Sequence, residues 1–242
     1  HVRSRRQRQM CIRDSILLDH KGTLWIGTQN GLNSYTQEGI KTYLHHSDDP
    51  HSLPSNYINH LTEDSLGNLW IATPKGLALY DAEQDRFNTT ISQAIYSSIK
   101  VKGGIWFGSE NTIYCYDYHS KKTKIIHIKK QEKKKNINMV DYRIQKMVYL
   151  DKNKILVGTR RKGIYSYNCQ TQQFSLFIPS SPNLLTSLYI TLDQHIYTSF
   201  YGSGLYCYDQ TGKIQEHYTQ TNSGLNNNYI LDITEHLSLI HI

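Results

Sequence analysis

The sequence contains Leu69-Trp70-Ile71-Ala72-Thr73 and, after two intervening residues, Gly76-Leu77-Ala78-Leu79-Tyr80. Both segments are rich in the aromatic and aliphatic residues that suit the interior of a sheet. Upstream, Asp64-Ser65-Leu66-Gly67-Asn68 is rich in turn formers and predicts a tight hairpin, and Ala82 to Asp85 turn the chain again downstream. The unit therefore predicts four short antiparallel strands, A to D, at Ile58–Glu63, Leu69–Thr73, Leu77–Asp81 and Arg86–Thr90.

The same pattern recurs along the chain. Five units align on an anchor in strand B, spaced by 45, 36, 50 and 41 residues: Trp25, Trp70, Trp106, Leu156 and Tyr197. A period of roughly 40–50 residues built from short strands is typical of β-propeller blades. We therefore predict an all-β fold of about five four-stranded antiparallel blades, with almost no helix. Closure of a propeller hides its sheet edges. Because the five units are followed by the first strand of a sixth, at about residues 228–235, we predict an incomplete arc of a larger propeller, with a strained five-blade ring as the alternative.

Two features of strand B have a packing interpretation. The recurring Trp and Tyr anchors are expected to pack between neighbouring sheets, although a stacking platform for sugars is the alternative. Gly27, Gly108 and Gly158 interrupt strand B, where glycine normally weakens a strand. Their repetition predicts a close approach of backbone near the propeller axis.

The two ends of the chain look foreign to the repeat. Met10-Cys11-Ile12-Arg13-Asp14-Ser15 can be encoded by ATGTGTATAAGAGACAG plus one base, and Leu237-Ser238-Leu239-Ile240-His241-Ile242 by CTGTCTCTTATACACATC. The second string is the reverse complement of the first with one leading G, and it resembles the transposase end used in sequencing libraries. We expect residues 1–15 and 237–242 to be non-native tails and residues 16–236 to form the blades. A native basic N-terminal arm is the alternative.

The formal net charge of +7 is uneven. Five arginines and one aspartate in the N-terminal tail supply +4 of it. A basic arm would suggest nucleic acid, but an adapter-like arm does not, and we expect no nucleic-acid partner. A lysine-rich run at residues 121–135 predicts a solvated insertion, with an anionic partner as the alternative. No apolar run approaches the length of a membrane-spanning helix.

Three cysteines lie outside the tails. Cys115, Cys169 and Cys207 have no paired spacing, which fits neither a disulfide framework nor a metal site. Cys115 and Cys207 hold the same place in strand C of the third and fifth units, a whole blade apart. Because sheets pack about 10 Å apart, these two lie beyond the roughly 7 Å limit of a disulfide. We predict that all three are unpaired.

The first two units resemble a known repeat. Asp19-His20-Lys21-Gly22-Thr23-Leu24-Trp25-Ile26-Gly27-Thr28, then Asn30-Gly31-Leu32, is similar to the two-component regulator propeller repeat, and so are residues 64–73 with Lys75-Gly76-Leu77. The linker at residues 46–58 resembles the inter-blade segment of that family, and residues 223–230 are a degenerate copy. The resemblance covers about residues 16–236, but the D-x-x-G-x-L-W consensus is eroded in the last three units.

The resemblance carries functional expectations. It implies the periplasmic part of an inner-membrane hybrid histidine-kinase sensor, homodimeric at full length, that detects oligosaccharides and signals to a kinase absent from this chain. Any membrane contact would come through segments downstream of the propeller.

Catalytic motifs are not evident in the sequence. There is no phosphate-cradling loop, no G-x-S-x-G and no H-E-x-x-H, so we expect no cofactor, no metal and no catalytic residue. A propeller-type polysaccharide lyase or glycosidase is the alternative, and a protein-interaction scaffold is a further one. An enzyme would need a convergent catalytic pair on one face of the propeller.

A ligand is expected where the B–C loops and the D-to-A linkers gather, because sites are usually assembled from loops on a rigid scaffold. Guanidinium groups bind carboxylate or sulfate bidentately, and a tyrosine stacks on a sugar ring, so an acidic oligosaccharide is the expected ligand. Solvated loop charges are the alternative. The candidate residues are Gln29, Asn30, Lys75, Glu110, Arg160, Arg161, Lys162 and Tyr201.

Overall fold

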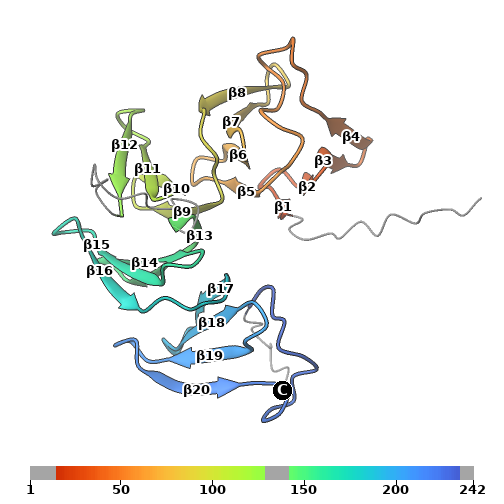
Figure 1. Ribbon diagram of the computed structural model, residues 1–242. Coiled ribbons are helices and arrows are strands. Elements are labelled where there is room, and N and C mark those ends of the chain that lie inside the picture. Colours follow the sequence, from red (N-terminus) through yellow and green to blue (C-terminus); the bar gives the residue numbers. More distant parts are fainter. Residues whose placement is uncertain (1–14, 129–141, 235–242) are drawn as a thin grey trace, which may run out of the picture. The chain divides into compact units, whose positions relative to one another are not determined.

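The computed structural model describes residues 15–128 and 142–234, and it divides the chain into two compact units. The first unit ends at Ile95 and the second begins at Tyr96. The described residues form twenty strands, and the strands of each sheet are consecutive in the chain (Figure 1). Within the described ranges there is no α-helix, so no helix there is long and apolar enough to cross a membrane.

The first unit contains two four-stranded antiparallel sheets. One sheet comprises β1 (Ser15–Leu18), β2 (Leu24–Thr28), β3 (Gly31–Thr36) and β4 (Gly39–Tyr43). The other comprises β5 (His60–Glu63), β6 (Leu69–Thr73), β7 (Gly76–Asp81) and β8 (Arg86–Ile91).

The second unit contains three more sheets of the same kind. They are β9 (Ser97–Val101), β10 (Gly104–Gly108), β11 (Thr112–Asp117) and β12 (Thr123–His127); β13 (Ile144–Asp151), β14 (Lys154–Thr159), β15 (Ile164–Asn168) and β16 (Gln173–Ile178); and β17 (Leu185–Ile190), β18 (Ile196–Phe200), β19 (Leu205–Tyr208) and β20 (Ile214–Tyr218). Every sheet follows the strand order A-B-C-D. The five sheets are propeller blades, as predicted, while closure into an arc or ring stays a prediction.

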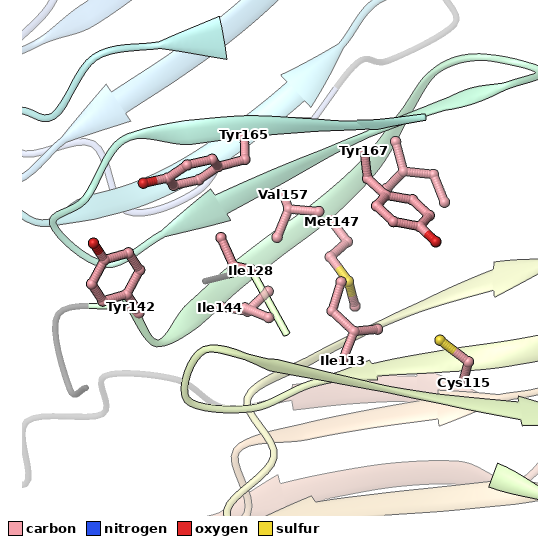
Figure 2. Close-up of a cluster of buried hydrophobic side chains, with 10 residues drawn as sticks. Ile113, Cys115, Ile128, Tyr142, Ile144, Met147, Val157, Tyr165 and Tyr167 are labelled. Carbon is pink, nitrogen blue, oxygen red and sulfur yellow. The ribbon is translucent and has the colours of Figure 1, made fainter. Parts of the chain in front are cut away.

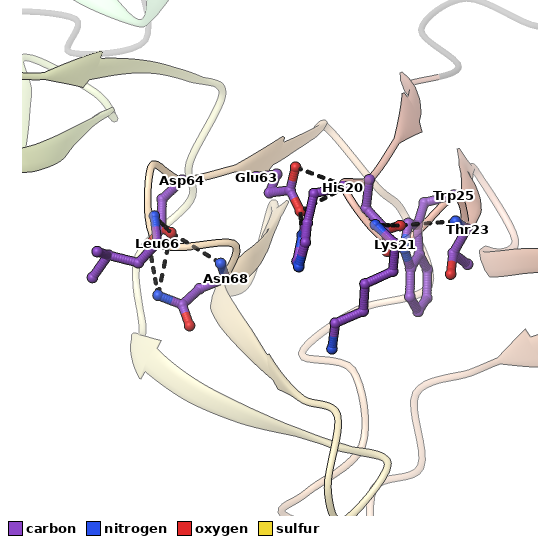
Figure 3. A network of polar contacts seen from close by, with 9 residues as sticks. His20, Lys21, Thr23, Trp25, Glu63, Asp64, Leu66 and Asn68 are labelled. Atoms are coloured by element: carbon purple, nitrogen blue, oxygen red, sulfur yellow. Dashed lines mark hydrogen bonds and ion pairs between the residues drawn. The ribbon is translucent and has the colours of Figure 1, made fainter.

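An aspartate closes the A–B hairpin in both sheets of the first unit. Asp64 Oδ1 accepts the backbone N–H of Asn68 at 2.9 Å (Figure 3). Its Oδ2 accepts Trp70 Nε1–H at 2.9 Å. Asp19 binds Trp25 Nε1–H in the same way, at 2.9 Å. Because each carboxylate satisfies both the turn and the buried indole, the D-x-x-G-x-L-W spacing fixes the hairpin and the anchor together.

Within each unit, neighbouring sheets meet through an aliphatic residue at the end of the linker that joins them. Ile58, which precedes β5, is fully buried against Gly27 of β2. Ile144, the first residue of β13, lies against Gly108 of β10, and Leu185 of β17 lies against Gly158 of β14 in the same way. The glycines therefore make room for a side chain of the following sheet. Our prediction of a backbone approach is wrong, because sheets face each other through their side chains.

Aromatic and aliphatic side chains fill the space between the sheets. Between β9–β12 and β13–β16 the buried set includes Ile113 and Cys115 from β11 and Tyr167 from β15 (Figure 2). Tyr167 meets Trp106 of β10 with ring centroids 5.6 Å apart and the planes at 73°. In the first unit, Trp25 meets Tyr80 edge-on at 5.0 Å. The packing interpretation is confirmed for Trp25 and Trp70, at 3% and 2% exposed, whereas Trp106 and Tyr197 are half-buried.

Several expected boundaries differ from the structure. Ser15 lies in β1, pairing with Gly27, while the foreign origin of residues 1–15 stays a prediction. In the second blade, strand C begins at Gly76 and strand D ends at Ile91, each one residue beyond the expected bound. Strand A of the second blade begins at His60 and not at Ile58, because Ile58 is the linker anchor. Residues 228–234 form no strand: a strand A pairs with strand B of its own blade, and no such partner lies in the described part of the chain. The expected tails, except Ser15, and the lysines at 129–135 lie outside the described residues.

All three described cysteines are free, as predicted. Cys115 and Cys207 are buried, and Cys169 is half-buried. Burial raises the pKa of the Cys115 thiol from its ordinary 9.0 to about 12, although Lys124 acts against this shift. Burial raises the pKa values of Cys169 and Cys207 as well. The native thiols are therefore poor nucleophiles at neutral pH.

We expect Gly108→Ala to destabilise the chain by about 1–3 kcal/mol through overpacking. An added Cβ would lie 2.6 Å from Ile144 Cγ2 and 2.5 Å from Ser97 Oγ. Urea unfolding measures the change. Gly224→Ala is the matched control, because its Cβ would meet no atom within 4 Å. Equal stabilities of the two variants would contradict the packing described here.

We expect iodoacetamide at pH 8 to alkylate Cys115 at least 10-fold more slowly in the native chain than in urea, because its raised pKa leaves little thiolate. Since folding raises this pKa, the stability that the neutral buried thiol contributes should fall as pH rises from about 9 to about 12. Peptide mass spectrometry follows each site. Detection of fewer than three free thiols among these positions in denatured, unreduced chain would overturn the assignment.

Candidate functional site

In the second unit, the B–C loops are hydrogen-bonded to the linker that enters their own sheet or to the linker that enters the next one. Arg160 N donates to Arg143 O at 2.8 Å, and Leu185 N donates to Arg160 O at 3.0 Å. One blade further, Tyr201 N donates to Leu184 O at 2.8 Å. These bonds place loops and linkers side by side at one end of the sheets. We call the side chains along this end the loop strip: Tyr96, Glu110, Arg143, Arg160, Arg161, Lys162, Tyr201 and Tyr229.

Arg143 lies at one end of the loop strip. Its guanidinium carbon lies 4.1 Å from the centroid of the Tyr96 ring, and its Nη2 lies 3.7 Å from Glu110 Oε1. The side chain is 22% exposed, and its buried Nε makes no hydrogen bond within the described residues. A partly exposed guanidinium held on an aromatic face suits a carboxylate or sulfate ligand.

Tyr96 and Glu110 complete this corner of the site. Tyr96 Oη–H donates to Glu110 Oε1 at 3.3 Å. Burial raises the pKa of Tyr96, Arg143 lowers it, and Glu110 raises it, so that the pKa is above its ordinary value. The phenol therefore remains a neutral donor at physiological pH, and it orients the carboxylate beside Arg143.

The loop between β14 and β15 carries three basic side chains. Thr159 fixes its turn: the hydroxyl donates to Gly163 O at 2.6 Å and accepts Lys162 N–H at 2.9 Å. Arg160 and Lys162 are half-buried, and Arg161 is exposed. Together with Arg143 they make this part of the loop strip cationic.

Two tyrosines lie at the other end of the loop strip. Tyr201 follows β18, and its ring meets Tyr229 with centroids 5.0 Å apart and the planes at 68°. The residues are 51% and 58% exposed, although aromatic rings are usually more buried. Asn183 and Ser203 lie nearby, with Asn183 Nδ2 donating to Ser203 Oγ at 2.7 Å. Exposed ring faces beside hydrogen-bonding groups suit a pyranose ring.

The structure divides the predicted site residues between the two units. Glu110, Arg160, Arg161, Lys162 and Tyr201 lie on the loop strip. Gln29, Asn30 and Lys75 are exposed on the B–C loops of the first unit, where the hydroxyls of Thr28 and Thr73 accept the N–H groups of Asn30 and Lys75. Whether any of them binds a ligand stays a prediction.

Sequence reasoning missed Tyr96, Arg143 and Tyr229. A signal was present, because each is the immediate neighbour of a linker aliphatic residue: Ile95, Ile144 and Ile230 respectively. Attention to the B–C loops alone left these linker positions out. Within the described ranges, no group of three or more His, Cys, Asp or Glu side chains is arranged to hold a metal ion.

Comparison with known proteins adds two family matches. The model of the two-component regulator propeller matches residues 7–30 and 52–75. The first match begins inside the segment that we expected to be foreign. No curated protein sequence matches the chain.

Solved structures show the same fold at low sequence identity. The extracellular domain assigned to a hybrid two-component system of B. thetaiotaomicron superposes with a TM-score of 0.66 at 18% identity, over 90% of this chain and 30% of that one. PorZ, a surface component of the type-IX secretion system of Porphyromonas gingivalis, superposes with a TM-score of 0.65 at 17% identity, over 93% of this chain and 36% of PorZ. Virginiamycin B lyase from Staphylococcus aureus superposes with a TM-score of 0.62 at 16% identity, over 86% of this chain and 70% of the lyase. The chain thus spans about a third of the extracellular domain.

We expect Arg143→Met to lower the free energy of unfolding by about 1–2 kcal/mol, because it removes a cation from the face of Tyr96. Glu110→Gln should cost less than about 1 kcal/mol, since its 3.7 Å contact with Arg143 is long and partly exposed. Urea unfolding measures both. Lys154→Met, at an exposed position of β14, is the matched control. An Arg143→Met variant as stable as this control would show that the guanidinium is not anchored.

Proposed function

We propose that this chain, which matches the two-component regulator propeller at two segments, is the ligand-sensing part of a periplasmic two-component sensor. The observation that carries the proposal is the pair of family matches at residues 7–30 and 52–75. The fold shared with an extracellular domain of a hybrid two-component system supports it. In this proposal the propeller passes a conformational signal to a kinase elsewhere in the protein, which is a homodimer anchored in the inner membrane.

The proposed ligand is an acidic oligosaccharide bound at the loop strip. Arg143, Arg160, Arg161 and Lys162 supply cations, and guanidinium groups match the planar oxygens of carboxylate and sulfate. Tyr201 and Tyr229 offer exposed rings on which a sugar ring can stack. Cationic donors at one end of a strip and aromatic faces at the other fit an extended, charged carbohydrate.

We propose binding rather than catalysis. The alternative, a propeller-type lyase, draws support from the fold shared with virginiamycin B lyase. Glu110 is the one carboxylate of the loop strip, however, and it already accepts from Tyr96 and faces Arg143. The loop strip as defined contains no second carboxylate to pair with Glu110, whereas it is well provided with cationic groups that bind anions.

Calorimetry on the intact sensor tests the proposal, with a trimer of galacturonate as the probe and maltotriose as its neutral counterpart. We expect the galacturonate trimer to bind and Arg160→Ala with Arg161→Ala to weaken it by 10-fold or more, about 1.4 kcal/mol. The matched control is Lys152→Ala with Lys213→Ala, which removes the same charge from exposed turns at the other end of the sheets.

The outcomes separate the parts of the proposal. Equal affinity in the wild type and the arginine double variant would remove the loop strip as the site. A preference for maltotriose would replace the acidic ligand with a neutral one. Accumulation of an unsaturated product in the galacturonate mixture would favour the lyase.

A further inference from the structure

A groove of about 900 Å³ lies in the first unit, between the sheets β1–β4 and β5–β8. It is formed by the A–B and C–D turns of both sheets, at residues 19–23, 36–41, 66–69 and 79–85. These turns lie at the opposite end of the sheets from the B–C loops. The volume is within the range of about 300–1,000 Å³ that small-molecule sites occupy.

The groove is acidic. Five carboxylate side chains line it, against two lysines: Asp19, Glu38, Asp81, Glu83 and Asp85, with Lys21 and Lys41. His20 also lines it and pairs with Glu63, which lies outside the lining. The excess of three negative charges favours a cationic occupant.

One wall of the groove is an aromatic cluster built around a carboxylate. Tyr43 and Tyr80 pack edge-on with centroids 6.1 Å apart, and Tyr80 meets Trp25 behind them. Both phenols donate to Asp85 Oδ1, Tyr43 at 2.8 Å and Tyr80 at 2.7 Å. These bonds hold Asp85 against the two rings, with its other oxygen turned to Lys41.

Lys41 already places an ammonium group in this cluster. Its Nζ pairs with Asp85 Oδ2 and lies 5.0 Å from the centroid of the Tyr43 ring. A carboxylate and an aromatic face around one cation form an ammonium cage. The side chains of Lys41 and Asp85 are 57% and 39% exposed. Because exposed ion pairs contribute about 0–1 kcal/mol to stability, another ammonium group can displace Lys41 from Asp85.

We propose that this groove binds an amino sugar, whose ammonium group replaces Lys41 between Asp85 and Tyr43. The sugar ring then lies in the groove, where Thr36 and Asn88 offer polar groups to its hydroxyls. Lys41 acts as an internal competitor that keeps the cage closed to neutral sugars. This site is separate from the loop strip and does not depend on the function proposed for it.

Calorimetry on the chain with glucosamine, and with glucose as its neutral counterpart, tests the proposal. We expect glucosamine to bind at least 10-fold more tightly than glucose, and Asp85→Asn to weaken glucosamine by 10-fold or more. Lys41→Met should strengthen it about 3-fold to 10-fold. Lys21→Met is the matched control, because it removes the same charge from the groove outside the cage, and it should strengthen binding less.

Three results would overturn the proposal: equal affinity for glucose and glucosamine, weaker glucosamine binding in Lys41→Met, or identical gains in Lys41→Met and Lys21→Met. The last would show a diffuse electrostatic attraction without a cage. If Asp85→Asn fails to fold, the comparison of glucosamine affinity between Lys41→Met and Lys21→Met still decides the proposal. Arg160→Ala with Arg161→Ala should leave glucosamine binding unchanged, which separates this site from the loop strip.

Discussion

Each linker ends in a buried aliphatic residue whose N–H reaches back to the preceding sheet. Ile58 donates to Thr28 O at 2.9 Å, Ile95 to Thr73 O at 3.1 Å, and Ile144 to Ser109 O at 2.9 Å. Because the strands of a blade bond only within their own sheet, these bonds and the side chains beneath them join neighbouring blades within each unit. At Gly27, Gly108 and Gly158 the aliphatic side chain fills the space over strand B that the glycine leaves, so register and packing are set at one point.

That joint also explains where a binding surface can form. The backbone hydrogen bond of the anchor holds the end of the linker beside the B–C loop of the preceding blade, and it does not depend on the side chains of that loop. Residues next to the anchor, such as Tyr96 and Arg143, are therefore carried to the surface on rigid backbone, as are Arg160 and Tyr201 in the loops. The joint requires only an aliphatic residue and a carbonyl, so the neighbouring side chains are available for binding.

The sequence predicted features that local spacing controls. The strand at Leu69–Thr73 was placed without error, and the D-x-x-G-x-L-W pattern located both hairpins whose aspartates bind an indole. Features made by distant residues were missed. Arg143 meets Glu110 only because a linker crosses a loop 33 positions away. The glycine pattern was noticed, but its cause was not, since a sequence does not show which side chain fills the space.

Hairpin chemistry also gives the two ends of a blade different electrostatics. Asp209 closes the turn after β19 as Asp64 closes the one after β5, and the Thr211 hydroxyl and the Lys213 N–H hold the pKa of Asp209 below its ordinary value. Carboxylates therefore gather at the turn ends because unpaired N–H groups need acceptors there. Such an aspartate is explained by its own turn. Asp85 differs, because its oxygens face two phenols and an ammonium group that the turn does not require, and this surplus of partners is what separates a binding cage from a hairpin cap.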